Sequence, residues 1–298
     1  MQYRFFICDV FTTERFGGNQ LAVFPDATGL DTGQMQQLAR EFNYSESTFV
    51  LPASGEFTRR VRIFTPTIEV PFAGHPNIGT AFALAVDGVF GEIADEATVL
   101  FDEVAGPVPV LIRREGEAQF WCELEAPQAL SLGDTADPAL VAAVLSLDVG
   151  DINTAVHAPQ VASVGLPFLV VELTSREALK RARVDMTQLE KLRDTGVVPD
   201  VHVYTHSNDE FDIRARMFAP FDNVTEDPAT GSANCALVAL LTQSGVGNDA
   251  GDSWRIAQGV EMGRPGVLEA RTRREGGEIK TWVGGHSVLV ADGKVFVN

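Results

Sequence analysis

The feature that most constrains this chain is a short motif that occurs twice, about half a chain length apart. Residues 60–66 read Arg-Val-Arg-Ile-Phe-Thr-Pro, and residues 214–220 read Arg-Ala-Arg-Met-Phe-Ala-Pro, so four of the seven positions are identical. Each copy alternates polar and apolar residues and ends at a proline, which is typical of a β-strand that leaves its sheet.

A second pair of similar segments follows these strands. Residues 74–84 resemble residues 231–241, and each segment is soon followed by a Gly-Val pair, at 88–89 and at 245–246. Both segments begin with small residues, are apolar on nearly every side and are followed by a glycine. This pattern predicts a buried helix with a glycine C-cap. The offset is 154 residues for the strands and 157 for the helices. We therefore expect a duplicated unit of strands wrapped around a buried helix.

The remaining pattern is that of an α+β protein. Alternation and composition predict strands at 3–11, 20–24, 46–52, 58–65, 161–173 (with a turn at Gly165), 201–206 and 211–218, and a run of short strands over 253–297. Helices are expected at 31–42, after Asp31 as N-cap, and at 176–183 and 186–195. The boundary between the two halves is expected near 115–130.

Charge and hydropathy exclude several classes of function. The net charge of −18 repels phosphate backbones and anionic membrane surfaces, so nucleic-acid and membrane partners are not expected. No apolar stretch reaches the length of a membrane span, and the first residues lack the features of a signal peptide. A cytoplasmic protein is the expectation.

Neither the cysteines nor the histidines predict a metal site. Cys8, Cys122 and Cys235 lie far apart and are expected to be buried free thiols. His202 and His206 have the spacing of a helical metal pair, but their β-branched neighbours predict a strand, which holds the two side chains about 13 Å apart. We therefore expect no metal.

The starts of the two buried helices are the candidate binding sites. A helix start presents unpaired N–H groups and a partial positive charge, so the turns at Gly74 and Gly231 could hold a small carboxylate. The alternative is that these glycines only permit tight turns. His75 and Asp227 stand at the same two turns, where a structural histidine and a turn-capping aspartate are the plainer interpretations.

Glu46 is the candidate for acid–base chemistry. It stands where an apolar strand begins, and a carboxyl group kept partly dry there could take up and return a proton near neutral pH. The alternative is an exposed acid at a strand end.

Five segments in the same order resemble the PhzF family, which is related to diaminopimelate epimerase and proline racemase. They extend from the first strand almost to the C-terminus: 9–23, 45–50, 64–76, 226–233 and 258–265. The resemblance implies two half-barrel domains, each a curled sheet around a central helix. The domains would comprise residues 1–120, completed by 286–298, and residues 121–285.

The resemblance also implies roles for individual residues. The family's catalytic glutamate falls on Glu46, and its substrate-contacting histidine and aspartate fall on His75 and Asp227. Its other substrate contacts fall on Asn19, Ser45, Gly74, Gly231 and Ser232. It implies no cofactor and a homodimer. The racemase relatives use one cysteine at each helix start, whereas this chain has Ala73 and Pro228-Ala229 there, which excludes two-thiol racemisation.

The sequence therefore predicts a cofactor-free isomerase that moves a proton on a small amino or hydroxy acid, of the trans-2,3-dihydro-3-hydroxyanthranilate isomerase type. Two alternatives stay open. One is an epimerase or isomerase of another small acid, and the other is a non-catalytic metabolite-binding protein on the same scaffold.

Overall fold

Both glycine-led segments form buried helices, as predicted. Helix α2 (Gly74–Val86) and helix α6 (Gly231–Gln243) are buried on nearly every side. A glycine in the left-handed region follows each helix two residues after its end, Gly88 with φ 74° and Gly245 with φ 82°. The valine after each glycine donates its backbone N–H to the carbonyl five residues earlier, at 3.0 Å in α2 and 2.9 Å in α6. Both helices therefore stop in the same Schellman motif.

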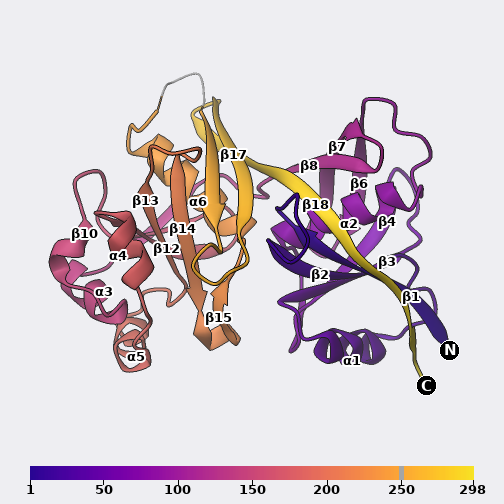
Figure 1. Ribbon diagram of the computed structural model, residues 1–298, viewed down its shortest axis with the longest axis horizontal. Coiled ribbons are helices and arrows are strands. Elements are labelled where there is room, and N and C mark those ends of the chain that lie inside the picture. Colours follow the sequence, from indigo (N-terminus) through magenta and orange to yellow (C-terminus); the bar gives the residue numbers. More distant parts are fainter. Residues whose placement is uncertain (248–251) are drawn as a thin grey trace. The chain divides into compact units, whose positions relative to one another are not determined.

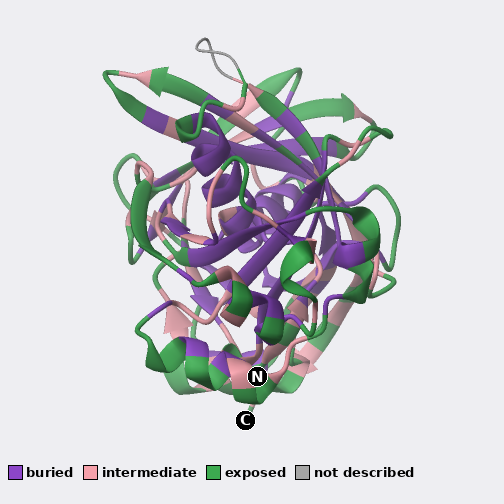
Figure 2. Cartoon of the chain, turned by 90° about the vertical axis from the view of Figure 1, so that its left-hand side faces the viewer, coloured by how far each residue is buried: buried purple, intermediate pink, exposed green. Residues whose placement is uncertain are grey.

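The computed structural model describes residues 1–247 and 252–298, and these form two units. Residues 1–125 and 284–298 make the first unit, and residues 126–283 make the second. Figure 1 shows α2 and α6 each accompanied by the strands of its own unit, and Figure 2 shows the interior strands and helices as buried. Each helix thus supplies a continuous apolar surface for the sheet of its unit.

The strands of the first unit form a closed series of pairings. They are β1 (Gln2–Val10), β2 (Asn19–Phe24), β3 (Glu46–Leu51), β4 (Arg59–Phe64), β5 (Glu69–Val70), β6 (Glu96–Glu103), β7 (Gly106–Gly116), β8 (Gln119–Glu125) and β18 (Glu278–Phe296), which belongs to this unit from Gly284 onward. The pairing order is β18–β1–β2–β3–β4–β6–β7–β8, and β8 pairs again with β18. The mixed α+β class is confirmed, and this ladder closes on itself as a barrel.

The second unit repeats the strand order of the first. Its strands are β9 (Ser131–Thr135), β10 (Ile152–Asn153), β11 (Gln160–Ser163), β12 (Pro167–Leu173), β13 (Val201–His206), β14 (Ile213–Ala219), β15 (Val224–Asp227), β16 (Ser253–Gln258) and β17 (Gly266–Glu275). The series β1 to β4 and then β6 and β7 has the same succession of parallel and antiparallel pairings as β11 to β14 and then β16 and β17. The predicted duplication is therefore visible in the hydrogen-bond ladder itself.

The outer helices follow the expected capping rules. They are α1 (Thr32–Phe42), α3 (Pro138–Val144), α4 (Arg176–Arg181) and α5 (Met186–Asp194), with short 3₁₀ helices η1 (Val149–Asp151) and η2 (Pro220–Asp222). Asp31 caps α1 as predicted, and it forms a capping box with Gln34. Among the helices of the described residues, none has the length and hydropathy that a membrane crossing requires.

The prediction of short strands over 253–297 is wrong in its last part. Residues 278–296 form one strand of 19 residues, β18, and its glycines do not break it. A Cβ on Gly284 would stand 2.4 Å from the ring of Trp121, and one on Gly293 would stand 2.6 Å from the ring of Phe5. These glycines make room for aromatic rings of the neighbouring strands rather than marking turns.

Close packing of α2 gives a first testable prediction. A Cβ on Gly79 would stand 2.6 Å from both Leu21 Cδ2 and Val10 Cγ2, on strands β2 and β1. Since overpacking a core usually costs about 1–3 kcal/mol, Gly79→Ala should lower the free energy of unfolding by about that amount in a urea titration. Gly150→Ala is the control, because nothing lies within 4 Å of a Cβ there. Equal stability of the two variants would contradict this packing.

Candidate active site

Three residues singled out in the first half meet at one edge of the first unit. Strands β2 and β3 run parallel, with Leu21 opposite Glu46, so Asn19 at the start of β2 and Glu46 at the start of β3 share the same end of the sheet. The start of α2 places His75 beside them. The Glu46 carboxylate lies 3.6 Å from His75 Nε2, and His75 Nδ1 lies 3.5 Å from Asn19 Nδ2.

Ser45 extends this group. Its hydroxyl donates to Asn19 Oδ1 at 3.2 Å, so the side chains form a chain of contacts from Ser45 through Asn19 and His75 to Glu46. The Glu46 side chain keeps 20% of its surface exposed, whereas the His75 side chain keeps 7%. The carboxylate is therefore open to solvent on one side and faces a buried imidazole on the other.

His75 is a neutral imidazole at physiological pH. Burial lowers the pKa of His75 to about 3, and an interaction with the backbone of Gln20 opposes that shift only in part. The buried Nε2 atom, which faces Glu46, has no hydrogen-bond partner of ordinary geometry within the described chain. A neutral ring can donate or accept a hydrogen bond without bringing a positive charge to the site.

The second unit holds a corresponding group at the start of α6. Asp227 ends β15 and is buried, and its Oδ2 atom accepts the hydroxyl of Thr230 at 2.5 Å. Gly231 and Ser232 are the first two residues of the helix, and Ser232 is partly exposed. The predicted residues of this half thus lie within six positions of one another at one helix start.

Gln258 is the residue that the sequence analysis left without a role. Its Nε2 atom donates to Asp227 O at 2.8 Å and to Thr230 Oγ1 at 2.9 Å, and its Oε1 atom accepts Thr230 N at 3.2 Å and Asn234 Nδ2 at 2.8 Å. One buried amide therefore holds the whole turn.

A glycine beside Gln258 is the signal that could have revealed this contact. Gly259 has φ 78°, and a Cβ there would stand 2.5 Å from Pro228 O and 2.4 Å from Arg264 O. A glycine that allows such a close approach of two backbones marks a strand end pressed against the turn.

The two buried helices differ from the outer helices at their N-termini. Side chains cap the first turns of α1, α3, α4 and α5, whereas the N-cap residues of α2 and α6, Ala73 and Thr230, make no side-chain capping bond within the described chain. Without such a cap, the partial positive charge of a helix start is available to an anion.

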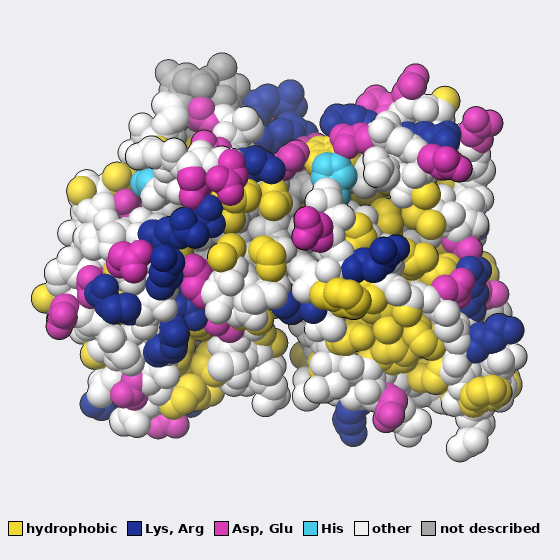
Figure 3. All heavy atoms as spheres, viewed as in Figure 1, with side chains coloured by type: hydrophobic (Ala, Val, Ile, Leu, Met, Phe, Trp, Pro, Cys, Tyr) yellow, Lys and Arg dark blue, Asp and Glu magenta, His cyan; other side chains and the backbone are white. Residues whose placement is uncertain are grey.

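His202 and His206 lie on strand β13, as predicted. His202 is buried, and its Nε2 atom lies 3.2 Å from Asn234 Oδ1, so this histidine supports α6. All three cysteines are buried free thiols, as expected. Acidic and basic side chains are interspersed on the face shown in Figure 3, with no large field of one sign.

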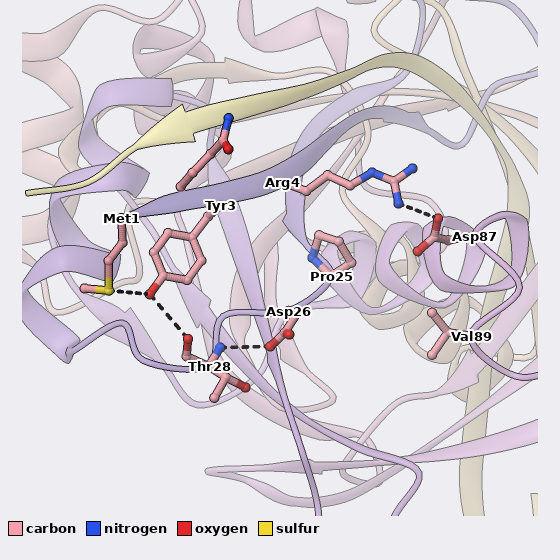
Figure 4. A pocket seen from close by; sticks show the side chains of 9 residues that line it. Met1, Tyr3, Arg4, Pro25, Asp26, Thr28, Asp87 and Val89 are labelled. Carbon is pink, nitrogen blue, oxygen red and sulfur yellow. Dashed lines mark hydrogen bonds and ion pairs between the residues drawn. The ribbon is translucent and has the colours of Figure 1, made fainter.

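A hollow in the first unit lies apart from these groups. It is lined by residues of β1, the loop after β2 and the end of α2, among them Tyr3, Arg4, Asp26 and Asp87 (Figure 4). Arg4 is paired with Asp87 at 2.8 Å there. This hollow shares no residue with the predicted site.

Comparison with known proteins identifies the family. The family model PhzC-PhzF, described as phenazine biosynthesis-like protein, matches residues 8–293. An uncharacterized isomerase of Mesorhizobium japonicum is 38% identical, with full coverage of both chains. Trans-2,3-dihydro-3-hydroxyanthranilate isomerase of Pseudomonas aeruginosa is 33% identical over 99% of this chain and 100% of the relative.

A solved structure has the same fold. The Bacillus anthracis phenazine biosynthesis protein of the PhzF family superposes with a TM-score of 0.90 at 23% identity and covers 100% of both chains. The family model covers nearly the whole sequence, and relatives above 30% identity align over their full length. The chain therefore belongs to the PhzC-PhzF family of phenazine biosynthesis-like proteins and is an isomerase of that family.

Proposed function

We propose that the chain is a cofactor-independent isomerase that moves a proton between two carbons of a small amino or hydroxy acid, with Glu46 as the general acid–base. The relatives named as trans-2,3-dihydro-3-hydroxyanthranilate isomerases make that compound the first substrate to test. The observation that carries the proposal is the partly exposed Glu46 carboxylate, 3.6 Å from a buried neutral imidazole at the uncapped start of α2.

In the proposed reaction the ionised Glu46 takes a proton from an activated C–H bond of the substrate. The electron pair moves through the conjugated system, and the same carboxyl group returns the proton to another carbon. No electrons leave the substrate, so the step balances without an oxidant or a cofactor.

The other residues of the site bind and polarise the substrate. His75, Asn19 and Ser45 are in position to contact polar groups of a substrate held against Glu46. The backbone of Gly74 would add a contact at the start of α2, and substrate contacts by Asp227, Gly231 and Ser232 of the second unit stay a prediction. Uncapped helix starts stabilise negative charge as it develops during proton removal.

Solvent isotope incorporation tests the proposal. The enzyme in D₂O is incubated with trans-2,3-dihydro-3-hydroxyanthranilate and with a panel of small amino and hydroxy acids, and mass spectrometry follows deuterium in substrate and product. We expect isomerised product that carries deuterium at one carbon, because a carboxyl group exchanges its proton with solvent.

The outcomes separate the alternatives. Deuterium incorporation into another acid, with none into trans-2,3-dihydro-3-hydroxyanthranilate, would show that the other acid is the substrate and would support the same proton-transfer mechanism. Tight binding of an acid with no exchange at any carbon would overturn the proposal in favour of a metabolite-binding protein. The homodimer stays a prediction, which sedimentation velocity of the purified chain tests.

A further inference from the structure

The duplicated ladder assigns a counterpart to Gln258 in the first unit. In the second unit, Ala215 on β14 pairs with Gln258, the last residue of β16. The repeat places Val61 where Ala215 stands. Arg60 pairs with Asp102 in the parallel ladder of β4 and β6, and the same register extended by one residue places Glu103, the last residue of β6, opposite Val61.

The surroundings of the two positions correspond as well. Asn234 Nδ2 donates to Thr230 O at 2.9 Å, and Asn77 Nδ2 donates to Ala73 O at 3.1 Å, which is the same bond at the start of each buried helix. The end of β6 also lies against the turn before α2, since Ala105 donates its N–H to Pro71 O at 3.1 Å.

Glu103 differs from Gln258 in what its two oxygens contact. It is 7% exposed, and neither oxygen has a hydrogen bond of ordinary geometry to any described residue. The Oδ1 atom of Asn77 is buried and lacks a partner in the same sense. A buried carboxylate cannot donate to an amide oxygen, whereas a protonated carboxyl group can both donate and accept, as the side-chain amide of Gln258 does.

The electrostatic surroundings favour the protonated form. Burial raises the pKa of Glu103 to about 8, and the Asn77 amide beside it opposes that rise only in part. On β4, Arg60 is exposed and stands opposite Asp102 in the β-ladder. The side chain of Asp102 points to the opposite face of the sheet from that of Glu103, because successive residues of a strand alternate in direction. On α2 the ring of His75 is neutral. No charged group of the described residues contributes to the shift.

We infer that Glu103 is a positioning residue, which in its protonated form bonds the Asn77 side chain and holds the start of α2, and with it Gly74 and His75, in place for catalysis. The catalytic part of this inference rests on the proposed function. The protonation of Glu103 and its support of α2 do not.

Thermal unfolding as a function of pH tests the protonated state. A group whose pKa is raised on folding contributes stability that is complete below its unfolded pKa and is lost as pH rises to the folded pKa. The wild type should therefore lose stability between about pH 4.5 and 8 relative to Glu103→Gln, which cannot ionise. The Tm of Glu103→Gln should match the wild type near pH 4.5 and exceed it increasingly up to pH 8.

Two further variants serve as controls. Glu96→Gln, which alters an exposed glutamate of the same strand, should show no pH-dependent Tm difference from the wild type. Gln258→Glu places a carboxyl group at the corresponding position of the second unit, and its Tm should fall below the wild type increasingly as pH rises.

Infrared spectroscopy of the wild type gives a direct readout. A band of a protonated carboxyl group should disappear as pH rises through about 8 and should be missing from Glu103→Gln. Absence of that band in the wild type at pH 6, or a Tm difference that does not change with pH, would overturn the inference.

The pH profile of turnover tests the positioning role. With a confirmed substrate, kcat/KM of the wild type should decline above about pH 8, and Glu103→Gln should lack that decline. If the wild type and Glu103→Gln have identical pH profiles of kcat/KM while their Tm values differ as expected, Glu103 stabilises the fold but does not position catalytic groups. If no acid undergoes exchange, the proposed function fails, while the Tm and infrared results still decide the protonation of Glu103.

Discussion

Glu46→Gln should lower the rate of substrate isomerisation by roughly 10²–10⁴-fold, the range that a positioned general acid–base contributes. Glutamine keeps the size of the side chain, but its neutral amide cannot take up a proton near neutral pH. Because Glu46 is partly exposed at the first residue of β3, the substitution should leave the Tm close to that of the wild type. The measurement is kcat on a substrate confirmed by deuterium incorporation.

A matched control separates loss of the base from loss of charge. Glu41→Gln removes an exposed carboxylate near the end of α1, a few residues earlier in the chain, and should leave kcat unchanged. Near-normal turnover by Glu46→Gln would remove Glu46 from the mechanism and leave the proton transfer to another group. Loss of activity in both variants would point to a general effect of charge on binding of the substrate.

The duplication could be predicted from the sequence because equivalent residues form the same contacts in the two units. In each copy of the repeated strand, the second arginine forms a two-pronged pair with a glutamate of the next strand, Arg62 with Glu69 and Arg216 with Glu226. Each arginine also lies over the phenylalanine two residues later, at 5.1 Å and 4.8 Å from the ring centre. Because these contacts join residues that are close in sequence, the motif that forms them can be recognised in both copies.

The supports of the site could not be predicted in the same way. Gln258 and Glu103 are the last residues of their strands, and they reach the helix starts through the register of a parallel ladder, which no local pattern encodes. The uncapped helix starts and the residues Asn19, Glu46 and His75 could be named from the sequence. Their proximity depends on the parallel pairing of β2 and β3, which only the structure shows.

The length of β18 escaped prediction for a related reason. Glycine in a strand commonly signals a turn or a bulge, and several glycines occur in the last 45 residues. At Gly284 the reason for the glycine lies on another strand, in the ring of Trp121. A sequence shows which residue is small but does not show the side chain that needs the space.

Glu226→Gln should cost about 3–5 kcal/mol of unfolding free energy, because it leaves the buried charge of Arg216 without its partner. The Arg216 side chain is 4% exposed and that of Glu226 is 14% exposed, and the two bonds between them measure 2.8 and 2.9 Å. Arg216 Nη1 also donates to the carbonyls of Leu179 and Ala182, which keep the guanidinium in the interior after the carboxylate is lost.

The repeat supplies the matched control for this prediction. Glu69→Gln breaks the corresponding pair, whose bonds are slightly shorter at 2.7 Å but whose side chains are more exposed, 16% for Arg62 and 27% for Glu69. Water can solvate the remaining Arg62, so this variant should lose only about 1 kcal/mol when both variants are compared by urea titration. Equal losses in the two variants would mean that geometry rather than burial sets the strength of these pairs. A much larger loss for Glu226→Gln would show that the same arginine–glutamate contact contributes more to stability in the second unit than in the first, because its charges there are less solvated.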